Sequence, residues 1–182
     1  MINQKYATSY IEGFGTESVF CELAQSKGFK VIPASKKENI EDHIDFFLYR
    51  DGKQYSVDVK AMKRISRNSI NKDEDAIWIE FRNVRGNNGW IYGKQDLVAF
   101  EFDSYFVLVK RKELLDFVTV SLNSFTKVVS SSRHALFNLY QRRGRQDLIT
   151  RIKRDNILAL KNKIWIKHEG FKQIPEAVNA VH

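Results

Sequence analysis

Two aspartates and a lysine stand close together in a stretch whose other residues favour β-strands. Asp45 comes directly before the apolar segment 46–49, and Asp58 and Lys60 lie at the end of the segment 54–60. Carboxylate oxygens are the ligands that Mg²⁺ prefers, and Mg²⁺ keeps several waters that a substrate phosphate can replace. A lysine beside such an ion can orient or deprotonate a water molecule. These residue types therefore suit metal-assisted chemistry at a phosphate group.

The dipeptide between the two segments fixes how they pair. Asp51-Gly52 predicts a two-residue hairpin turn, because a type I′ turn needs positive φ at both positions. The register of such a hairpin places Asp45 directly opposite Asp58. Facing residues have Cβ atoms about 4.5–5.5 Å apart, and like charges at that separation destabilise a sheet unless a cation compensates. Strand alternation places Lys60 on the face of Asp58, roughly 7 Å from the expected metal.

A resemblance to a known superfamily begins at these residues. Asp45, twelve intervening residues and then Asp58-Val59-Lys60 resemble the active-site signature of the PD-(D/E)xK nucleases, with Ile44 in place of the signature proline. The stretch Gly15-Thr16-Glu17, followed by an apolar helix and a glycine, resembles the first helix of its Holliday-junction-resolvase members. The similarity in the order of elements spans residues 15–109.

The resemblance implies a mixed central sheet flanked by helices and a metal-dependent hydrolytic site. It implies that Asp45, Asp58 and the backbone carbonyl of Val59 bind Mg²⁺, for which Mn²⁺ is a possible substitute. Glu17 would assist as a third carboxylate and a possible metal ligand. Lys60 would lie near the attacking water and the scissile phosphate.

Other interpretations of the acidic residues stay open at this stage. Asp45 and Asp58 could be solvated on an exposed sheet face, and Glu17 could be an ordinary acidic residue of a first helical turn, where the helix dipole favours it. Glu22 is a second candidate for the helix carboxylate. Glu80 lies on one face of the expected strand 76–82, from which it could reach the same site or be solvated or paired.

The positive charge of the chain is concentrated near its C-terminal end. The formal net charge is +8, and residues 133–163 hold nine basic residues against two acidic ones. Such concentration indicates a polyanionic partner, since phosphate neutralisation supplies most sequence-independent affinity for nucleic acids. An anionic membrane surface is a weaker competitor. We expect nucleic-acid contacts from basic residues of three regions: Lys63, Arg64, Arg67, Arg85, Lys94, Arg142, Arg143, Arg145, Arg151 and Arg154.

The apolar pattern predicts one α/β (α+β) domain over residues 1–182, with a core at about 15–120 and a basic helical extension at about 130–182. A helix at 18–27 ends at Gly28. A second helix, at 146–160, would carry Arg151 and Arg154 as a basic ridge. Strands are expected at 29–32, 44–49, 54–59, 76–82, 97–102, 105–110 and 164–167, and further helices at 112–117 and 133–142. A helix, a mixed sheet and then helices indicate an α+β fold.

Several classes of protein are excluded or disfavoured. Cys21 is the single cysteine, which excludes a disulfide framework and a thiolate metal cluster. The first residues lack the apolar stretch of a signal peptide, and no apolar run approaches the roughly 20 residues of a membrane span. We therefore expect a cytoplasmic protein without a membrane partner. The histidines, which lack the spacing of metal ligands, are expected in packing or surface roles: His43, His134, His168 and His182.

Together these features predict a Mg²⁺-dependent endonuclease that hydrolyses DNA phosphodiester bonds. A structure-selective enzyme for Holliday-junction or branched DNA in recombination or repair, acting as a homodimer, is the preferred subclass. A restriction-type endonuclease that reads base sequence is one alternative. A non-catalytic DNA-binding protein on the same fold is another. RNA stays open as the substrate, because phosphate electrostatics does not distinguish the 2′-hydroxyl.

Overall fold

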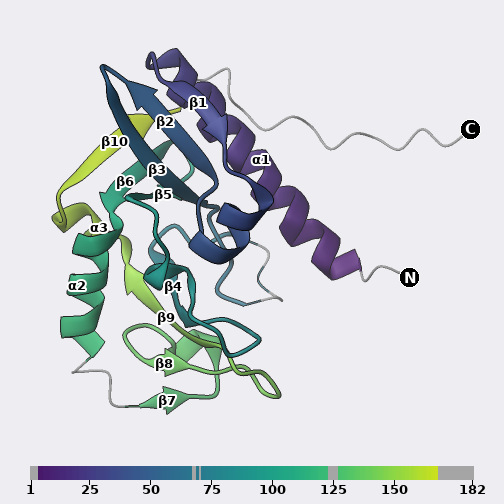
Figure 1. The fold of residues 1–182 in the computed structure, drawn as a ribbon. Coiled ribbons are helices and arrows are strands. Elements are labelled where there is room, and N and C mark those ends of the chain that lie inside the picture. Colours follow the sequence, from purple (N-terminus) through teal and green to yellow (C-terminus); the bar gives the residue numbers. More distant parts are fainter. Residues whose placement is uncertain (1–3, 67–68, 70, 123–126, 168–182) are drawn as a thin grey trace, which may run out of the picture.

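The computed structural model describes residues 4–66, 69, 71–122 and 127–167. It has an α+β architecture in which a mixed sheet is flanked by helices (Figure 1), as the sequence predicts. In chain order the elements are α1 (Gln4–Ser26), β1 (Lys30–Pro33), β2 (Phe46–Arg50), β3 (Lys53–Lys60), β4 (Ala76–Arg82), β5 (Leu97–Glu101), β6 (Tyr105–Lys110), α2 (Arg111–Leu122), β7 (Val128–Val129), β8 (Leu139–Tyr140), β9 (Leu148–Lys153), α3 (Arg154–Ala159) and β10 (Asn162–Ile166).

The larger sheet has six strands in the order β1-β2-β3-β5-β6-β10. Its neighbours are antiparallel except β3 and β5, which run parallel. A smaller sheet has the order β4-β9-β8-β7. The strand at 76–82 is therefore correctly predicted, but it belongs to this second sheet and does not continue the first.

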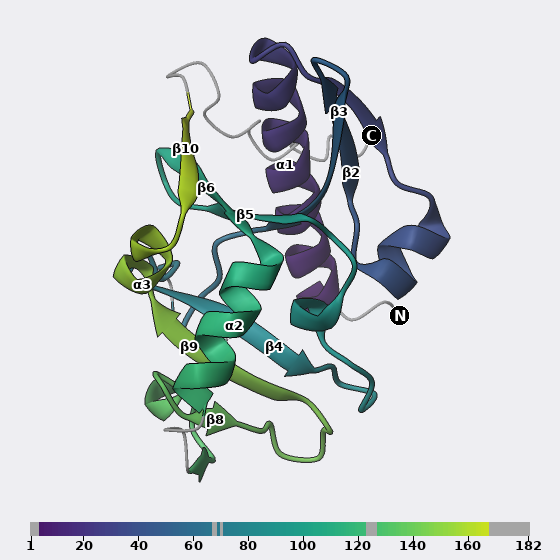
Figure 2. The same cartoon turned by 60° about the vertical axis from the view of Figure 1, so that its left-hand side comes forward.

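The six-stranded sheet separates two hydrophobic cores. On one face, α1 packs Phe20, Leu23 and Ala24 against apolar side chains of β2, β3, β5 and β6. On the other face, apolar residues of β5 and β6 meet side chains from β4, β9, α2 and α3. Figures 1 and 2 show α1 on one side of this sheet and α2, β4 and β9 on the other. Residues on alternate positions of β3 consequently face different cores.

The turns that position these layers follow from local sequence. Asp51 and Gly52 have φ values of 52° and 71°, as the predicted type I′ turn requires. Gly28, with φ of 81°, ends α1, as predicted, and the Phe29 N–H reaches back to the carbonyl of Ala24 at 3.1 Å. In the described part of the chain, no helix combines the length and the apolar content that a bilayer crossing requires.

The helices predicted at 133–142 and 146–160 are wrong except at residues 154–159, and residues 168–182 of the predicted extension lie outside the described residues. Residues 133–142 form a 3₁₀ turn and the short strand β8, and residues 146–160 form β9 before the six-residue helix α3. Leu148, Ile149 and Ile152 fit helical spacing as well as a strand. The open edge of β4 decides between them, because β9 pairs with it and thereby buries Thr150 and Ile152 completely. The β-branched residues of this segment also favour a strand.

Candidate functional site

The β2–β3 hairpin brings the two predicted aspartates together. The register is the predicted one, with Phe46 opposite Val57. Directly before β2, Asp45 donates its N–H to the Val57 carbonyl at 2.8 Å, and its Oδ2 accepts the N–H of Val59 at 2.7 Å. The carboxylate of Asp45 lies close enough to Asp58 that its negative charge raises the pKa of Asp58. The two acidic side chains therefore adjoin at the end of the hairpin.

Lys60 lies against the second of these carboxylates. Its Nζ is 2.6 Å from Asp58 Oδ1, and its side chain is 27% exposed whereas that of Asp58 is 3% exposed. The ammonium group also lies 5.1 Å from the centre of the Trp90 indole ring. Burial raises the pKa of Asp58 to about 8, with the positive charge of Lys60 opposing this change and Asp45 adding to it. The charge of this carboxylate is thus poorly compensated by the protein.

Glu17 approaches the same group of residues from α1. Burial raises its pKa to about 7, the charge of Asp45 adds to this increase, and the charge of Lys60 opposes it. The adjacent Thr16 fixes this part of the helix, since its Oγ1 donates to Glu101 Oε2 at 2.8 Å in a buried contact. Glu22, the alternative helix carboxylate, is exposed. The geometry therefore favours Glu17.

Three polar contacts at the site were not predicted from the sequence. Asn39 Nδ2 donates to Asp45 Oδ1 at 2.6 Å. The fully buried Gln95 directs its Nε2 to Asp58 Oδ2 at 3.4 Å and to the Trp90 carbonyl at 2.9 Å. His43 was expected to have only a packing or surface role, but its pKa is lowered by burial and by the nearby charge of Lys60. The tertiary fold brings Gln95 to the carboxylates, whereas Asn39 and His43 lie within six residues of Asp45 and are placed by the local helical turn at Glu38–Asp42.

Glu80 also reaches this region, although β4 belongs to the second sheet. Burial raises its pKa, and the positive charges of Lys60 and Arg142 oppose the increase. Its side chain accepts a hydrogen bond from the backbone N–H of Trp90. Of the two interpretations left open by the sequence, the structure favours a half-buried carboxylate near Lys60 over a solvated one.

The donor set fits a small hard cation. Asp45 and Asp58 offer adjacent carboxylate oxygens, and Val59, whose carbonyl is the expected third ligand, is bonded through its N–H to Asp45. Mg²⁺ commonly takes one or two carboxylates and completes its shell with waters. Within the described ranges, no three His, Cys, Asp or Glu side chains are already arranged as a metal centre. The fit is therefore to a site of few protein ligands, close to Lys60.

The residues predicted to contact nucleic acid occupy different environments. Arg142 is paired with Asp147, and Lys94 Nζ lies 2.8 Å from Asp42 Oδ1. Arg67 lies outside the described residues, and Arg145 is half-buried. The others of this group, apart from the two on the expected helical ridge, are exposed: Lys63, Arg64, Arg85 and Arg143.

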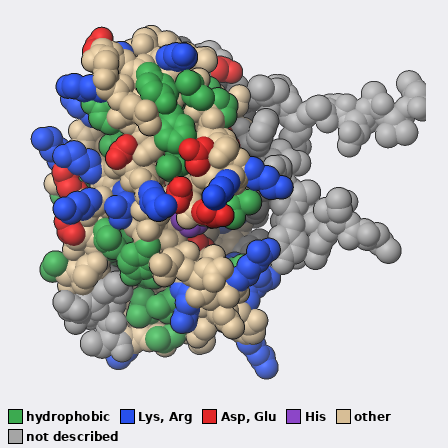
Figure 3. All heavy atoms as spheres, viewed as in Figure 1, with side chains coloured by type: hydrophobic (Ala, Val, Ile, Leu, Met, Phe, Trp, Pro, Cys, Tyr) green, Lys and Arg blue, Asp and Glu red, His purple; other side chains and the backbone are tan. Residues whose placement is uncertain are grey.

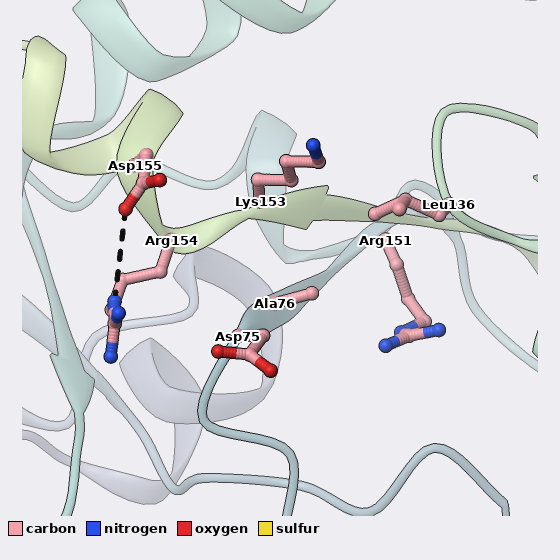
Figure 4. Close-up of a pocket in the computed structure, with 7 residues that line it drawn as sticks. All are labelled: Asp75, Ala76, Leu136, Arg151, Lys153, Arg154 and Asp155. Carbon is pink, nitrogen blue, oxygen red and sulfur yellow. Dashed lines mark ion pairs between the residues drawn. The ribbon is translucent and has the colours of Figure 1, made fainter.

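The expected ridge of Arg151 and Arg154 does not exist. Arg151 lies in β9, is buried, and forms an ion pair with Asp73. Arg154 begins α3, and its Nε lies 3.9 Å from Asp155. Both line a hollow of about 330 Å³ together with Asp75, where their side chains point away from each other (Figure 4). The acidic residues in and beside this hollow offset its positive charge, so it is a poor site for phosphate.

One face of the molecule carries charges of both signs. Figure 3 shows Asp and Glu side chains gathered near the middle of one face, with Lys and Arg side chains beside them and a histidine among them. A surface of this kind offers carboxylates for a cation and basic groups for an anion.

No protein-family model, curated protein or solved structure matches the chain.

Proposed function

We propose that this protein is a Mg²⁺-dependent nuclease of the PD-(D/E)xK type that hydrolyses DNA phosphodiester bonds. The observation that carries the proposal is the approach of Glu17, from α1, to the acidic pair and the lysine of the hairpin. The charges of Asp45 and Lys60 both act on Glu17. Three carboxylates and an ammonium group in one place suit hydrolysis of a phosphate ester better than they suit fold stability, because like charges repel.

Each residue has a distinct task in this proposal. Asp45 and Asp58 would hold Mg²⁺, which would supply polarisation of the scissile phosphate and a water of lowered pKa. Glu17 is the carboxylate placed to accept a proton from the attacking water. Lys60 has three N–H donors, of which Asp58 Oδ1 takes one, so the others can hold a phosphate oxygen. Asn39 and Gln95 hold the two aspartates in position.

The preferred subclass is a structure-selective enzyme for Holliday-junction or branched DNA in recombination or repair. It rests on the resemblance of the stretch Gly15-Thr16-Glu17 to the first helix of the Holliday-junction-resolvase members. Cutting both strands of a junction requires two active sites, so the enzyme acts as a homodimer. We propose a cytoplasmic location, because the substrate is cellular DNA and the chain has one cysteine.

One observation favours a second candidate, a non-catalytic DNA-binding protein. Lys60 Nζ already lies 2.6 Å from Asp58 Oδ1, and the described residues contain no ready set of three metal ligands. In that case the ion pair would serve the fold, and the basic residues alone would serve binding. This candidate and the nuclease differ in one measurable property, the metal-dependent cleavage of DNA.

The test is a cleavage assay with a labelled four-way junction and a linear duplex of matching sequence, in Mg²⁺, in Mn²⁺ and in chelator. Asp58→Asn and Lys60→Met are the informative variants. Asp51→Asn is the matched control, because it makes the same carboxylate-to-amide change at an 82% exposed position in the hairpin turn. Asparagine also tolerates the positive φ of that turn.

We expect cleavage by wild type and by Asp51→Asn only when metal is present. Asp58→Asn abolishes cleavage, and Lys60→Met lowers its rate by about 10²–10⁴-fold, the usual contribution of a positioned proton donor or acceptor. Preferential cutting of the junction supports the resolvase-like subclass, whereas dependence on base sequence in the duplex supports a restriction-type enzyme. Binding without cutting in every condition supports the non-catalytic candidate.

A further inference from the structure

Two loops next to the site are unusually rich in arginine. Residues 82–89 begin at the last residue of β4, and residues 141–147 lead into β9. We call these two loops the arginine loop pair. Together they contain a single acidic residue, Asp147, and no lysine. Figures 1 and 2 both show the two loops side by side at the ends of β4 and β9. Their arginines are Arg82, Arg85, Arg142, Arg143 and Arg145.

Direct contacts hold the two loops against each other. Arg82 Nε donates to the Gln146 carbonyl at 2.5 Å. The carboxamide of Gln146 lies so close to Gly86 that an added Cβ would come within 2.1 Å of its Oε1. Gly86 also has φ of 88°, a conformation that favours glycine. The loops therefore form one surface.

Each loop is also fixed internally by an amide side chain. Asn83 Oδ1 accepts the backbone N–H groups of Arg85 and Asn87 at 2.9 and 3.1 Å. In the second loop, Gln141 Nε2 donates to the Arg145 carbonyl at 3.0 Å. Arginine side chains on a fixed backbone lose less freedom when they bind, because only their own rotamers must be ordered.

The arginine loop pair is continuous with the candidate active site at two points. In the first loop, the backbone of Asn88 makes a hydrogen bond with the ring of His43. The charges of Lys60 and Asp45 both affect the pKa of this histidine. In the second, the charge of Arg142 acts on Glu80, which also senses Lys60. An anionic chain that places one group at the hairpin carboxylates would therefore pass over these loops.

We propose that the arginine loop pair binds the backbone phosphates of a DNA strand beside the phosphate at the active site. Guanidinium groups form two parallel hydrogen bonds with a phosphate, which a lysine cannot do, and the loops contain arginine only. The inference deepens the proposed function, on which it rests for the identity of the neighbouring reactive phosphate. Among the basic residues that the sequence predicts to contact nucleic acid, it selects those of these loops, in place of the expected ridge of Arg151 and Arg154.

The test measures binding apart from cleavage. A fluorescent four-way junction is titrated with the Asp58→Asn protein in chelator over a series of salt concentrations. Arg85→Gln and Arg143→Gln, alone and together, are made in this background because both side chains are exposed. Lys53→Gln and Lys163→Gln are the matched controls, because each removes one positive charge from an exposed position on a strand of the other sheet.

We expect each arginine variant to weaken binding about tenfold, as loss of a charge-assisted hydrogen bond does. The slope of log affinity against log salt should fall by about one for each arginine removed. The lysine controls should bind as tightly as the Asp58→Asn protein without further changes. Thermal melting should show that all variants are folded. Equal losses in arginine variants and controls, or a loss that depends on base sequence, would overturn the proposal.

The two proposals fail separately. If the protein with an intact site cuts DNA while the arginine variants bind normally, the nuclease stands and the loop proposal falls. If no protein cuts DNA but the arginine variants lose affinity selectively, the loop proposal stands and the nuclease falls. Absence of any DNA binding would contradict the role of the loops.

Discussion

Two pairs of a lysine and a buried carboxylate at the six-stranded sheet differ in how well the carboxylate is satisfied. Lys60 Nζ lies 2.6 Å from Asp58 Oδ1, and Lys167 Nζ lies 2.9 Å from Glu101 Oε1. The pKa of Asp58 is raised to about 8. That of Glu101 is lowered, although burial alone would raise it. A lysine at short range is therefore not enough to stabilise a buried negative charge.

The neighbouring groups explain the difference. Besides Lys167, Glu101 Oε2 accepts hydrogen bonds from Thr16 Oγ1 at 2.8 Å and from the Met62 N–H at 3.2 Å. Asp58 has only a long contact of 3.4 Å to Gln95 beyond its lysine, and a second carboxylate, Asp45, adjoins it. The Lys167–Glu101 pair is arranged for stability, whereas the Lys60–Asp58 pair leaves negative charge that a bound cation can neutralise.

The largest effect on folding is expected from the well-satisfied pair. Glu101→Gln should lower the free energy of unfolding by about 3 kcal/mol, because it leaves the mostly buried Lys167 without its counter-charge. Urea denaturation measures the change. The double variant Glu101→Gln/Lys167→Met should recover part of the loss, since it removes the unpaired charge as well. A single variant as stable as wild type would mean that the two pairs do not differ.

Asp58→Asn is expected to act on stability in the opposite direction. Removing a poorly compensated buried charge should leave the free energy of unfolding unchanged or increase it, while Mg²⁺ should no longer stabilise the protein. In wild type, Mg²⁺ at one hundred times its dissociation constant should add about 2.7 kcal/mol. Thermal melting with Mg²⁺ and with chelator measures both effects. A strong loss of stability in Asp58→Asn would assign this pair to the fold instead.

The sequence predicted the part of the site that depends on local rules. The turn Asp51-Gly52 set the register, and the register placed Asp45 beside Asp58. The position of Lys60 followed from strand alternation. Glu17 was predicted only from the resemblance, because the sequence of the first helix does not indicate which strands the helix will contact. Gln95 was missed for the same reason, since only the tertiary fold brings it to Asp58. Asn39 lies six residues before Asp45, and it was missed because the helical turn at Glu38–Asp42 was not predicted.

The second sheet is where the sequence misled. Helix and strand spacing both accommodate Leu148, Ile149 and Ile152, and the choice depends on the distant strand β4. The error moved Arg151 from an expected exposed ridge to a buried pair with Asp73. Pairing within a hairpin can be predicted from the sequence because the two strands are close in the chain. Pairing between strands more than sixty residues apart cannot, because a strand can pair with any compatible sheet edge.

Acid titration gives a finer test of the Glu101 pair. Its folded pKa lies below the usual 4.5, so the stability that it supplies is fully present above pH 4.5 and is lost as the pH falls through the lowered pKa. The difference in unfolding free energy between wild type and Glu101→Gln should therefore shrink as the pH is lowered below 4.5. Urea denaturation at several pH values measures this difference. A difference that does not change over the range would contradict the role assigned to the charge.

The smallest effect concerns the contact that links the two pairs. Thr16 donates to Glu101 and is adjacent to Glu17, so the stable pair helps to position α1 at the candidate active site. Thr16→Val keeps the side-chain shape and should lower the free energy of unfolding by about 1.5 kcal/mol, the contribution of a hydrogen bond to a charged group. Thr119→Val, at an exposed position of α2, is the matched control and should have little effect. In the Glu101→Gln background the cost of Thr16→Val should fall, because the acceptor is then uncharged. Equal costs in both backgrounds would mean that Thr16 stabilises α1 by packing alone, and that the two pairs act independently.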